Sequence, residues 1–295
     1  NRYPDREFVE LRDALAKYLG HDLSREQIWA ANGSNEVIQQ ILQAFGGPGR
    51  KALGFGPTYS MYRIISDGTD TEYVDAGRDE RYELSVETAV AAIKQHSPDI
   101  ILLCSPNNPT GTPLSLEVIE AVYSATSGVV VVDEAYAEFA YPDTPSAITL
   151  LEGRERLMVS RTMSKAFAFA GARVGYLAAD PAVIDALRLV RLPYHLSAFT
   201  QAAALAALSH SELMLSAVAD IRVQRDRIIA ELIEMDLDPY RSDSNFVLFG
   251  GVDSPKDVWQ QLLESGVLVR DVGIDGTLRV TAGTEAETTL FLDTL

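Results

Sequence analysis

Through the first two thirds of the chain, short apolar runs alternate with longer stretches in which apolar residues recur every three or four positions. The run 129–132 is apolar throughout, as a strand buried on both faces of a sheet must be. Residues 34–45 instead place Val37, Ile41 and Phe45 along one face of a helix. This alternation predicts the α/β class, with a mainly parallel central sheet covered by helices. Strands are predicted at 51–55, 71–76, 99–105, 128–136 and 156–160, and helices at 34–45, 58–66, 84–96 and 115–126.

The pattern changes near residue 197. Residues 197–235 are rich in alanine and predict one long helix, after which the apolar runs become short again. We therefore predict two domains. Residues 1–195 would form an N-terminal segment and a large α/β domain, and residues 196–295 the long connecting helix and a smaller α+β C-terminal domain. Strands of the smaller domain are predicted at 245–249, 267–271 and 278–283, and a helix at 255–265.

Composition narrows the classes of partner. The chain has 295 residues, 47% of them hydrophobic, which is enough to bury a large core. Its formal net charge is −17, and no cluster of basic residues offsets the acidic excess. We therefore expect small-molecule ligands and neither a nucleic-acid nor a membrane partner. No apolar run approaches the ~20 residues that span a bilayer.

The single cysteine, Cys104, lies in an apolar run and cannot form an internal disulfide. A reducing compartment is therefore favoured, and with no signal-peptide pattern at the N-terminus the chain is expected to be cytoplasmic. The four histidines show no metal-binding spacing, so no metal site is expected. Because the chain starts at Asn1 without a methionine, we also expect that a segment preceding it has been removed or left out.

Polar residues collect where the predicted strands end. Asn108 follows one strand, Asp133 and Tyr136 follow the next, and Ser164 and Lys165 follow a third. Ligands of open α/β sheets bind beyond the carboxyl ends of the strands, so these side chains are expected at one rim. Each alone could be an ordinary turn residue, helix cap or surface lysine. Together they indicate a site.

One chemistry uses this set of groups. Pyridoxal phosphate needs a lysine for a Schiff base, a carboxylate beside its ring nitrogen, hydrogen bonds to its ring oxygen, an aromatic side chain and a phosphate cup. Lys165 lies among alanine and phenylalanine residues, with Arg173 eight positions further on. Apolar neighbours and a second cation both lower the pKa of a lysine, which makes its amine a better nucleophile. Arg173 could also hold a phosphate through two hydrogen bonds.

Five motifs carry a family resemblance. The segments "SPNNPTG", "VVDEAYAEF", "RTMSKAFAFAGARVGY", "RLPYHLS" and "LRVTAG" occur in this order, and "NRYPD" opens the chain. Together they resemble the fold-type I, pyridoxal-phosphate-dependent aminotransferases, and specifically the histidinol-phosphate aminotransferases. The resemblance covers essentially the whole chain. The family pattern also has an arm before "RYPD", with an Asn-Glu-Asn-Pro-like motif, which this sequence does not contain.

The resemblance implies a role for each matching residue at the cofactor. Lys165 would form the Schiff base and move protons, and Asp133 would pair with the ring nitrogen. The ring oxygen would be bound by Asn108 and Tyr136. The catalytic residues implied by the resemblance are Lys165, Asp133 and Tyr136. The remaining cofactor-binding residues implied by the resemblance are Ser34, Asn35, Tyr59, Thr162, Ser164 and Arg173, with Tyr59 stacked on the ring and the others around the phosphate.

Three further residues follow from the same resemblance. Tyr3 matches a tyrosine that reaches the cofactor phosphate of the neighbouring subunit, which implies a homodimer with shared active sites. Arg279 matches the arginine that binds the anionic group of the substrate. Arg270 is a second candidate anchor, and Asn108 is also expected near the substrate. Without the resemblance, Arg270 and Arg279 could equally be solvated residues at the edge of a strand.

The implied reaction is transamination between histidinol phosphate and 2-oxoglutarate, giving imidazole-acetol phosphate and glutamate in histidine biosynthesis. An aromatic amino-acid aminotransferase on the same scaffold is the nearest alternative. A phosphoamino-acid decarboxylase and a noncatalytic ligand-binding homologue remain open as well. A nicotinamide-dependent enzyme is disfavoured, because "GFGPTY" places Pro57 where the dinucleotide fingerprint needs a flexible turn.

Overall fold

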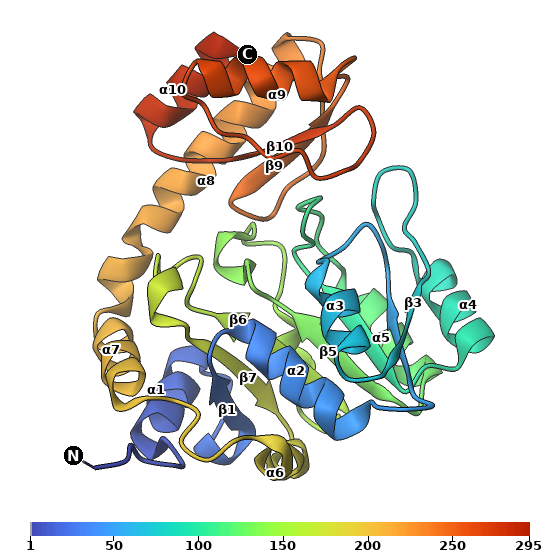
Figure 1. Ribbon diagram of the computed structural model, residues 1–295, viewed down its shortest axis with the longest axis vertical. Helices are drawn as coiled ribbons and strands as arrows, with labels where there is room; N and C mark the ends of the chain where they lie inside the picture. Colours follow the sequence, from blue (N-terminus) through green and yellow to red (C-terminus); the bar gives the residue numbers. More distant parts are fainter. Residues whose placement is uncertain (1) are drawn as a thin grey trace.

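The structure of the protein is a computed structural model that describes residues 2–295. Asn1, at which the predicted large domain begins, lies outside the described residues. Two sheets organise the chain, a seven-stranded one in the larger part of the molecule and a three-stranded one at the opposite end (Figure 1). The N-terminus lies beside the large sheet and the C-terminus on the small unit.

The large sheet has the strand order β1-β7-β6-β5-β4-β2-β3. Only β7 runs antiparallel to its neighbours, so the sheet is mainly parallel, as predicted. Every residue of β1, β4 and β7 is buried, which requires cover on both faces. The strands are β1 (Ile28–Ala31), β2 (Lys51–Gly54), β3 (Glu72–Asp75), β4 (Ile100–Cys104), β5 (Val129–Asp133), β6 (Leu157–Thr162) and β7 (Gly175–Ala179).

Helices supply that cover and connect the two sheets. Figure 1 shows α8 running from the side of the large sheet up to the small one, where α9 and α10 lie. The helices are α1 (Val9–Leu19), α2 (Ser34–Phe45), α3 (Met61–Asp67), α4 (Val86–His96), α5 (Leu116–Ala125), α6 (Pro181–Val190), α7 (Ala198–Ser209), α8 (Ser211–Glu234), α9 (Pro255–Glu264) and α10 (Glu285–Thr294), with short 3₁₀ helices at Arg25–Gln27, Ala137–Phe139, Ala147–Leu150 and Ala170–Ala172.

The small sheet has the order β10-β9-β8, all antiparallel, with β8 (Asp238–Pro239), β9 (Phe246–Gly250) and β10 (Leu278–Thr281). Each sheet has its own hydrophobic core. A third cluster joins the two units, because Phe246 of β9 packs against Tyr136 and Phe139 at the edge of the large sheet. The predicted domain division between residues 195 and 196 stays a prediction.

The single long helix predicted over 197–235 is wrong. Two helices, α7 and α8, occupy this stretch and meet at an angle of 70° at His210. The side chain of Ser209 bonds back to the carbonyl of Ala206 and to Nδ1 of His210, at 2.8 Å each. Such side-chain hydrogen bonds compete with the backbone bonds that would continue the helix. The helix α7 therefore ends at Ser209, although apolar helical sequence follows.

The strand predicted at 267–271 is also wrong. Only Arg270 pairs, through two backbone bonds of 2.9 Å with Arg279 of β10. On one side Val267 donates its backbone N–H to the Leu262 carbonyl at the end of α9, and on the other the Asp271 side chain accepts from the N–H of Gly273 in a turn. These two local hydrogen bonds leave only Arg270 in position to pair with β10.

In residues 2–295 no single helix is both long and apolar enough to cross a membrane, although the bent pair of α7 and α8 meets that test of length and composition when taken together.

Candidate active site

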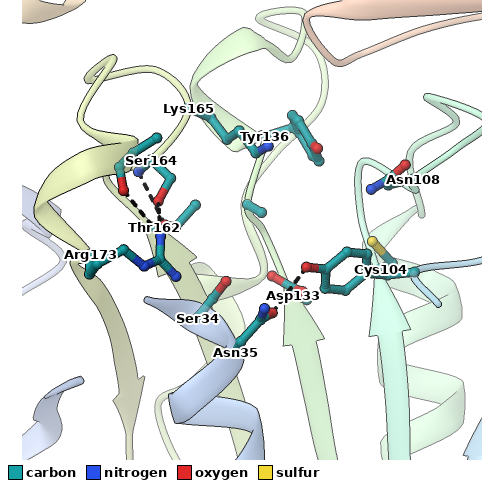
Figure 2. Close-up of a pocket in the computed structure, with 13 residues that line it drawn as sticks. Ser34, Asn35, Cys104, Asn108, Asp133, Tyr136, Thr162, Ser164, Lys165 and Arg173 are labelled. Atoms are coloured by element: carbon teal, nitrogen blue, oxygen red, sulfur yellow. Dashed lines mark hydrogen bonds between the residues drawn. The ribbon is translucent and has the colours of Figure 1, made fainter. Parts of the chain in front are cut away.

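A cavity of about 240 Å³ opens at the carboxyl ends of β4, β5 and β6. Figure 2 shows Cys104 and Asp133 at the tips of their strands, with Lys165 and Tyr136 on the far side of the cavity and Ser34 and Arg173 beside it. The side chains therefore converge from five separate segments of the chain, 34–35, 59, 104–108, 133–136 and 162–173. The cavity is lined by Ser34, Asn35, Tyr59, Cys104, Asn108, Asp133, Ala135, Tyr136, Thr162, Ser164, Lys165, Ala170 and Arg173.

Most of the residues predicted from the sequence line this one cavity. The exceptions are Tyr3, Arg270 and Arg279. Arg270 and Arg279 line a second cavity, of about 370 Å³, on the small unit. Tyr3 is 80% exposed and its ring stacks on that of Tyr194 at 4.6 Å. The arrangement brings the predicted set together, while the role of each residue stays a prediction.

Asp133 lies at the floor of the cavity as the last residue of β5, with its side chain buried. Tyr62 donates its hydroxyl to Oδ2 at 3.0 Å, and Ser160 donates to Oδ1 at 3.2 Å. Burial nevertheless dominates and raises the pKa of Asp133 to about 6. A buried carboxylate that faces a cavity in this way is suited to pair with a cationic ring nitrogen.

Lys165 follows β6 and extends its amine across the cavity opening. Its Nζ lies 5.3 Å from the centre of the Tyr136 ring. Removal of water by its surroundings lowers the pKa of Lys165, and the cations Arg279 and Arg173 lower it further against the opposing effect of Asp133. The amine is thus shifted toward the neutral form that attacks carbonyl groups.

An anion-binding corner forms beside the start of α2. Gly33, with a positive φ of 84°, precedes the helix. The backbone N–H groups of Ser34 and Asn35 are available to a ligand, while that of Glu36 donates to the Gly33 carbonyl at 3.2 Å. Arg173 donates to Ser164 Oγ at 3.4 Å and to the Asn32 carbonyl at 3.5 Å, both long bonds. Thr162 accepts the backbone N–H of Ser164 and so fixes its position.

The corner is built by close backbone contact. A Cβ at Gly33 would lie 2.4 Å from Nη2 of Arg173, and a Cβ at Gly175 would lie 2.1 Å from the backbone nitrogen of Ser34. Only residues without a side chain permit this approach of α2 to β7. The corner has the donors and the space that a phosphate group requires.

Three polar residues line the remaining walls. Tyr59 donates its hydroxyl to Oδ1 of Asn35 at 3.0 Å, and burial raises the pKa of Tyr59. Burial also raises the pKa of Tyr136, which keeps its hydroxyl protonated. Asn108 accepts a bond of 2.5 Å from Nη1 of Arg279, so the small unit reaches the rim of the cavity.

Arg279 has capacity for a further partner. Its guanidinium lies 4.6 Å from the centre of the Phe246 ring, and among the described residues its buried Nε has no hydrogen-bond partner. Burial, together with the charge of Arg270, lowers the pKa of Arg279. An anionic ligand at this edge would satisfy the unpaired nitrogen. Arg270 itself is exposed.

Sequence reasoning missed Tyr62, Ser160 and Cys104. Tyr62 follows Tyr59 by three residues within the helix predicted at 58–66, a spacing that places both on one face, although α3 begins only at Met61. Ser160 faces Asp133 in the pairing of β5 and β6, and no local pattern reveals that register. Cys104 lines the cavity, but burial raises the pKa of its thiol to about 12, so it is a wall and not a nucleophile.

The residues present fit pyridoxal phosphate. A lysine, a buried carboxylate and an anion-binding corner surround one cavity, and the free donors of Arg173 have no carboxylate partner among the described residues. Within residues 2–295 no group of three His, Cys, Asp or Glu side chains could hold a metal ion.

Comparison with known proteins gives one family. The model of "Aminotransferase class I and II" matches residues 1–295. Histidinol-phosphate aminotransferases from Paenarthrobacter aurescens and Thermobifida fusca are 67% and 57% identical, each over 100% of this chain and 80% of the relative. The crystal structure of histidinol-phosphate aminotransferase from Sinorhizobium meliloti in complex with pyridoxal-5'-phosphate is similar with a TM-score of 0.90, at 26% identity, over 99% of this chain and 81% of that one.

These matches confirm the family resemblance and the fold-type I architecture. They run the full length of the chain, so they include both sheets and the cavity between strand ends. The chain belongs to the class I and II aminotransferases, in the group formed by the histidinol-phosphate aminotransferases.

Proposed function

We propose that this chain is a pyridoxal-phosphate-dependent aminotransferase that transfers an amino group between histidinol phosphate and 2-oxoglutarate, in the biosynthesis of histidine. The products are imidazole-acetol phosphate and glutamate. The observation that carries the proposal is the meeting of Lys165, Asp133 and Arg173 around one cavity in a chain 67% identical to a histidinol-phosphate aminotransferase.

The chain's own residues divide the work of holding the cofactor. Ser164, Arg173 and the first turn of α2 bind the phosphate group. Asp133, held by Tyr62 and Ser160, pairs with the ring nitrogen and is drawn into its ionised form by that positive charge. When bound, the cofactor supplies a conjugated ring that withdraws electrons from the α-carbon of the substrate.

Lys165 binds the cofactor covalently and handles the proton. Its lowered pKa lets Nζ be neutral when the proton on the substrate α-carbon must be accepted. Asn108 and Tyr136 hold the ring oxygen, while Tyr59 lies against the ring. Each of these side chains lines the cavity, which supports the assignments.

Arg279 binds the anionic end of the substrate, with Arg270 as a second anchor. The unpaired Nε of Arg279 supports this role, because a carboxylate or phosphate oxygen would complete its hydrogen bonding. Glutamate and histidinol phosphate both carry an anionic group. One arginine-lined edge therefore serves both half-reactions.

We further propose that the active form is a cytoplasmic homodimer with shared active sites. Tyr3 lies exposed outside its own cavity, where it could reach a second subunit. Large apolar side chains at the end of α6 and the start of α7 are exposed too, Leu189 and Phe199 at 87% and 89%. A soluble monomer rarely exposes such a group, which supports an interface here. The single free cysteine fits a reducing compartment.

The test is covalent binding of the cofactor at Lys165. The protein reconstituted with pyridoxal phosphate should show the visible absorbance of a bound Schiff base, which borohydride removes, and Lys165→Ala should lack that absorbance. Lys94→Ala, at an exposed lysine of α4, is the matched control and should keep it. A wild-type protein without the absorbance would overturn the proposal.

A further inference from the structure

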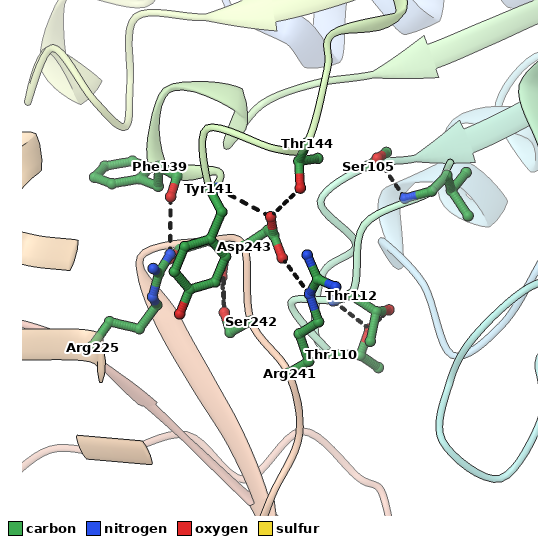
Figure 3. Close-up of polar contacts among 12 residues, drawn as sticks. Ser105, Thr110, Thr112, Phe139, Tyr141, Thr144, Arg225, Arg241, Ser242 and Asp243 are labelled. Carbon is green, nitrogen blue, oxygen red and sulfur yellow. Dashed lines mark hydrogen bonds and ion pairs between the residues drawn. The ribbon is translucent and has the colours of Figure 1, made fainter. Parts of the chain in front are cut away.

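The cofactor-binding residues and the substrate-binding arginine lie on different units. Asp133 ends β5 of the large sheet and Lys165 follows β6 of the same sheet, whereas Arg279 lies on β10 of the small sheet. Catalysis by one cavity therefore depends on how the two units are held together. A buried carboxylate, Asp243, lies at that junction (Figure 3).

Asp243 is fully buried and has a donor on each side. Its Oδ2 accepts the backbone N–H of Tyr141 at 3.1 Å and the hydroxyl of Thr144 at 2.6 Å, both from the large unit. Its Oδ1 accepts from Nε of Arg241 at 3.0 Å, within its own segment. The segment 141–144 follows Tyr136 after one 3₁₀ turn, so Asp243 holds the loop that begins at a cofactor-binding residue.

The backbone of Asp243 fixes a second loop of the site. Its N–H donates to the Gly111 carbonyl at 2.8 Å. A Cβ at Gly111 would lie 2.5 Å from Oγ of Ser242, so the two segments are in direct contact. Gly111 and Asn107 close a tight turn around Asn108, through a bond of 2.7 Å from the Gly111 N–H to the Asn107 carbonyl.

The other end of the same segment leads to Arg279. Residues 241–245 run directly into β9, whose Leu248 pairs with Arg279 of β10. The carbonyl of Asn245 accepts the N–H of Ala282 at 2.9 Å, which ties the segment to the end of β10. The segment of Asp243 is thus bonded both to the turn that carries Asn108 and to the end of β10, which carries Arg279, and these two residues meet across the rim at 2.5 Å.

A second buried charge completes the junction. Arg225 of α8 is fully buried and donates to the carbonyls of Phe139 and Ser244, at 2.9 and 3.2 Å. Its guanidinium lies 4.2 Å from the centre of the Tyr141 ring. Nη2 of Arg225 has no hydrogen-bond partner among the described residues, so the guanidinium is held by its Nη1 and Nε bonds alone. Buried charges held by hydrogen bonds fix one arrangement of the groups around them more than they add stability.

We propose that Asp243 is a positioning residue that sets the distance between the substrate-binding Arg279 and the cofactor-binding loops of Asn108 and Tyr136. This inference rests on the proposed function. It deepens that function, because it assigns the alignment of substrate and cofactor to a residue that contacts neither.

The kinetic test uses Asp243→Asn and the milder Thr144→Val, which removes one donor and keeps the carboxylate. Both should raise KM for histidinol phosphate, Asp243→Asn by about tenfold, and leave kcat and cofactor affinity within about threefold. The control is Asp99→Asn, which breaks the contacts of Asp99 with Arg50 and Lys51 at the opposite edge of the sheet and should leave KM unchanged. A KM unchanged in both junction variants, or raised equally in Asp99→Asn, overturns the inference.

The energetic coupling between Asp243 and Arg279, measured from the KM values of single and double variants, tests the inference more sharply than loss of activity does. If Asp243 acts through Arg279, adding Asp243→Asn to Arg279→Lys should raise KM much less than it does alone. Additive effects overturn the inference.

A structural readout separates this inference from the proposed function. Spin labels at Glu87→Cys and Lys256→Cys, both exposed and on different units, should give a narrow distance distribution that broadens in Asp243→Asn. The buried thiol of Cys104 is poorly reactive because its pKa is about 12. An unchanged distribution overturns the inference even if transamination is confirmed, and a wild-type protein without transamination leaves the distances as a separate test.

Discussion

At the scale of single residues, Asp133 shows how burial prepares a group for a partner. Without the cofactor its carboxylate is buried among neutral donors, which are the hydroxyls of Tyr62 and Ser160 and the backbone N–H of Ala135, and its pKa rises from 3.8 to about 6. A positive ring nitrogen would reverse that shift. The attraction between the carboxylate and the ring nitrogen would therefore offset the free-energy cost of burying the carboxylate.

This environment predicts the pH dependence of folding. The folded protein without cofactor binds a proton at Asp133 that the unfolded chain has already lost, so the stability contributed by this site falls as the pH rises from 3.8 to about 6. Asp133→Asn has no carboxyl group at this site and therefore lacks this pH-dependent contribution to stability. In urea unfolding, the stability of Asp133→Asn relative to wild type should grow by on the order of 1 kcal/mol between roughly pH 5 and pH 7.5. A difference that does not change with pH would contradict this reading of Asp133.

Gly33 predicts a second effect on cofactor binding. In Gly33→Ala the new Cβ would meet Nη2 of Arg173 at 2.4 Å, and the φ of 84° disfavours any side chain. Arg173 must move away from the corner, so the dissociation constant of pyridoxal phosphate should rise by about tenfold. Gly171→Ala is the control, because its Cβ would find open space. Equal cofactor affinity in the two variants would show that the corner does not bind the phosphate.

Much of the site could be predicted at this scale, and the reason is local. Asp133 ends a strand, and Asn108 and Lys165 come within a few residues of a strand end, so their place at the sheet edge follows from the strand pattern alone. Ser160 and Asp243 could not be found in this way. Their partners lie 27 and about 100 residues away in the chain, and only the folded register brings them together.

At the scale of elements, a buried ion-pair cluster ties β5 to β6. Arg161 donates to Glu134 at 2.9 Å and lies 3.6 Å from Glu138, and all three side chains are largely buried. Because Glu134 follows Asp133 and Arg161 lies four residues before Lys165, the cluster fixes the strand ends that carry the two central groups of the site.

Removing one partner of this cluster leaves buried charge without compensation. Arg161→Met should therefore lower the free energy of unfolding by about 3 kcal/mol or more. Arg154→Met breaks the exposed pair of Arg154 with Glu120 and should cost about 1 kcal/mol or less. Urea unfolding of both variants measures the difference, and equal losses would be inconsistent with a special role of the buried cluster.

Element boundaries were predictable where hydrophobic periodicity was strong and unopposed. The strands β4, β5 and β9 lie where the apolar runs place them. The boundary between α7 and α8 within residues 197–235 was not predictable, because the helical periodicity continues on both sides of Ser209 and His210. The side chains of these two residues form local hydrogen bonds, and α7 ends there. Periodicity reports which residues can be helical, and it does not report where one helix turns into another.

At the scale of the whole molecule, the shared active site can be tested by complementation. Lys165→Ala removes the catalytic amine, and Tyr3→Ala removes the residue expected to act in the neighbouring subunit. In a heterodimer of the two variants, one site combines an intact Lys165 with the partner's intact tyrosine. Isolated heterodimers should therefore recover about half of the wild-type activity.

If the active sites are not shared between subunits, the heterodimer should have a different activity. If Tyr3 acts within its own subunit, no site of the heterodimer is complete, and activity should stay at or below that of the Tyr3→Ala homodimer. Size-exclusion chromatography of the same samples checks that the species measured is a dimer. A monomeric wild-type protein with full activity would contradict the proposed assembly.

The central claim, that this chain transaminates histidinol phosphate, is tested most directly by the half-reaction of the cofactor-loaded protein in a single turnover. The visible absorbance of the bound cofactor should be lost rapidly with histidinol phosphate and with glutamate, and at least about tenfold more slowly with phenylalanine. Faster loss with phenylalanine than with histidinol phosphate would contradict the account and identify an aromatic amino-acid aminotransferase instead.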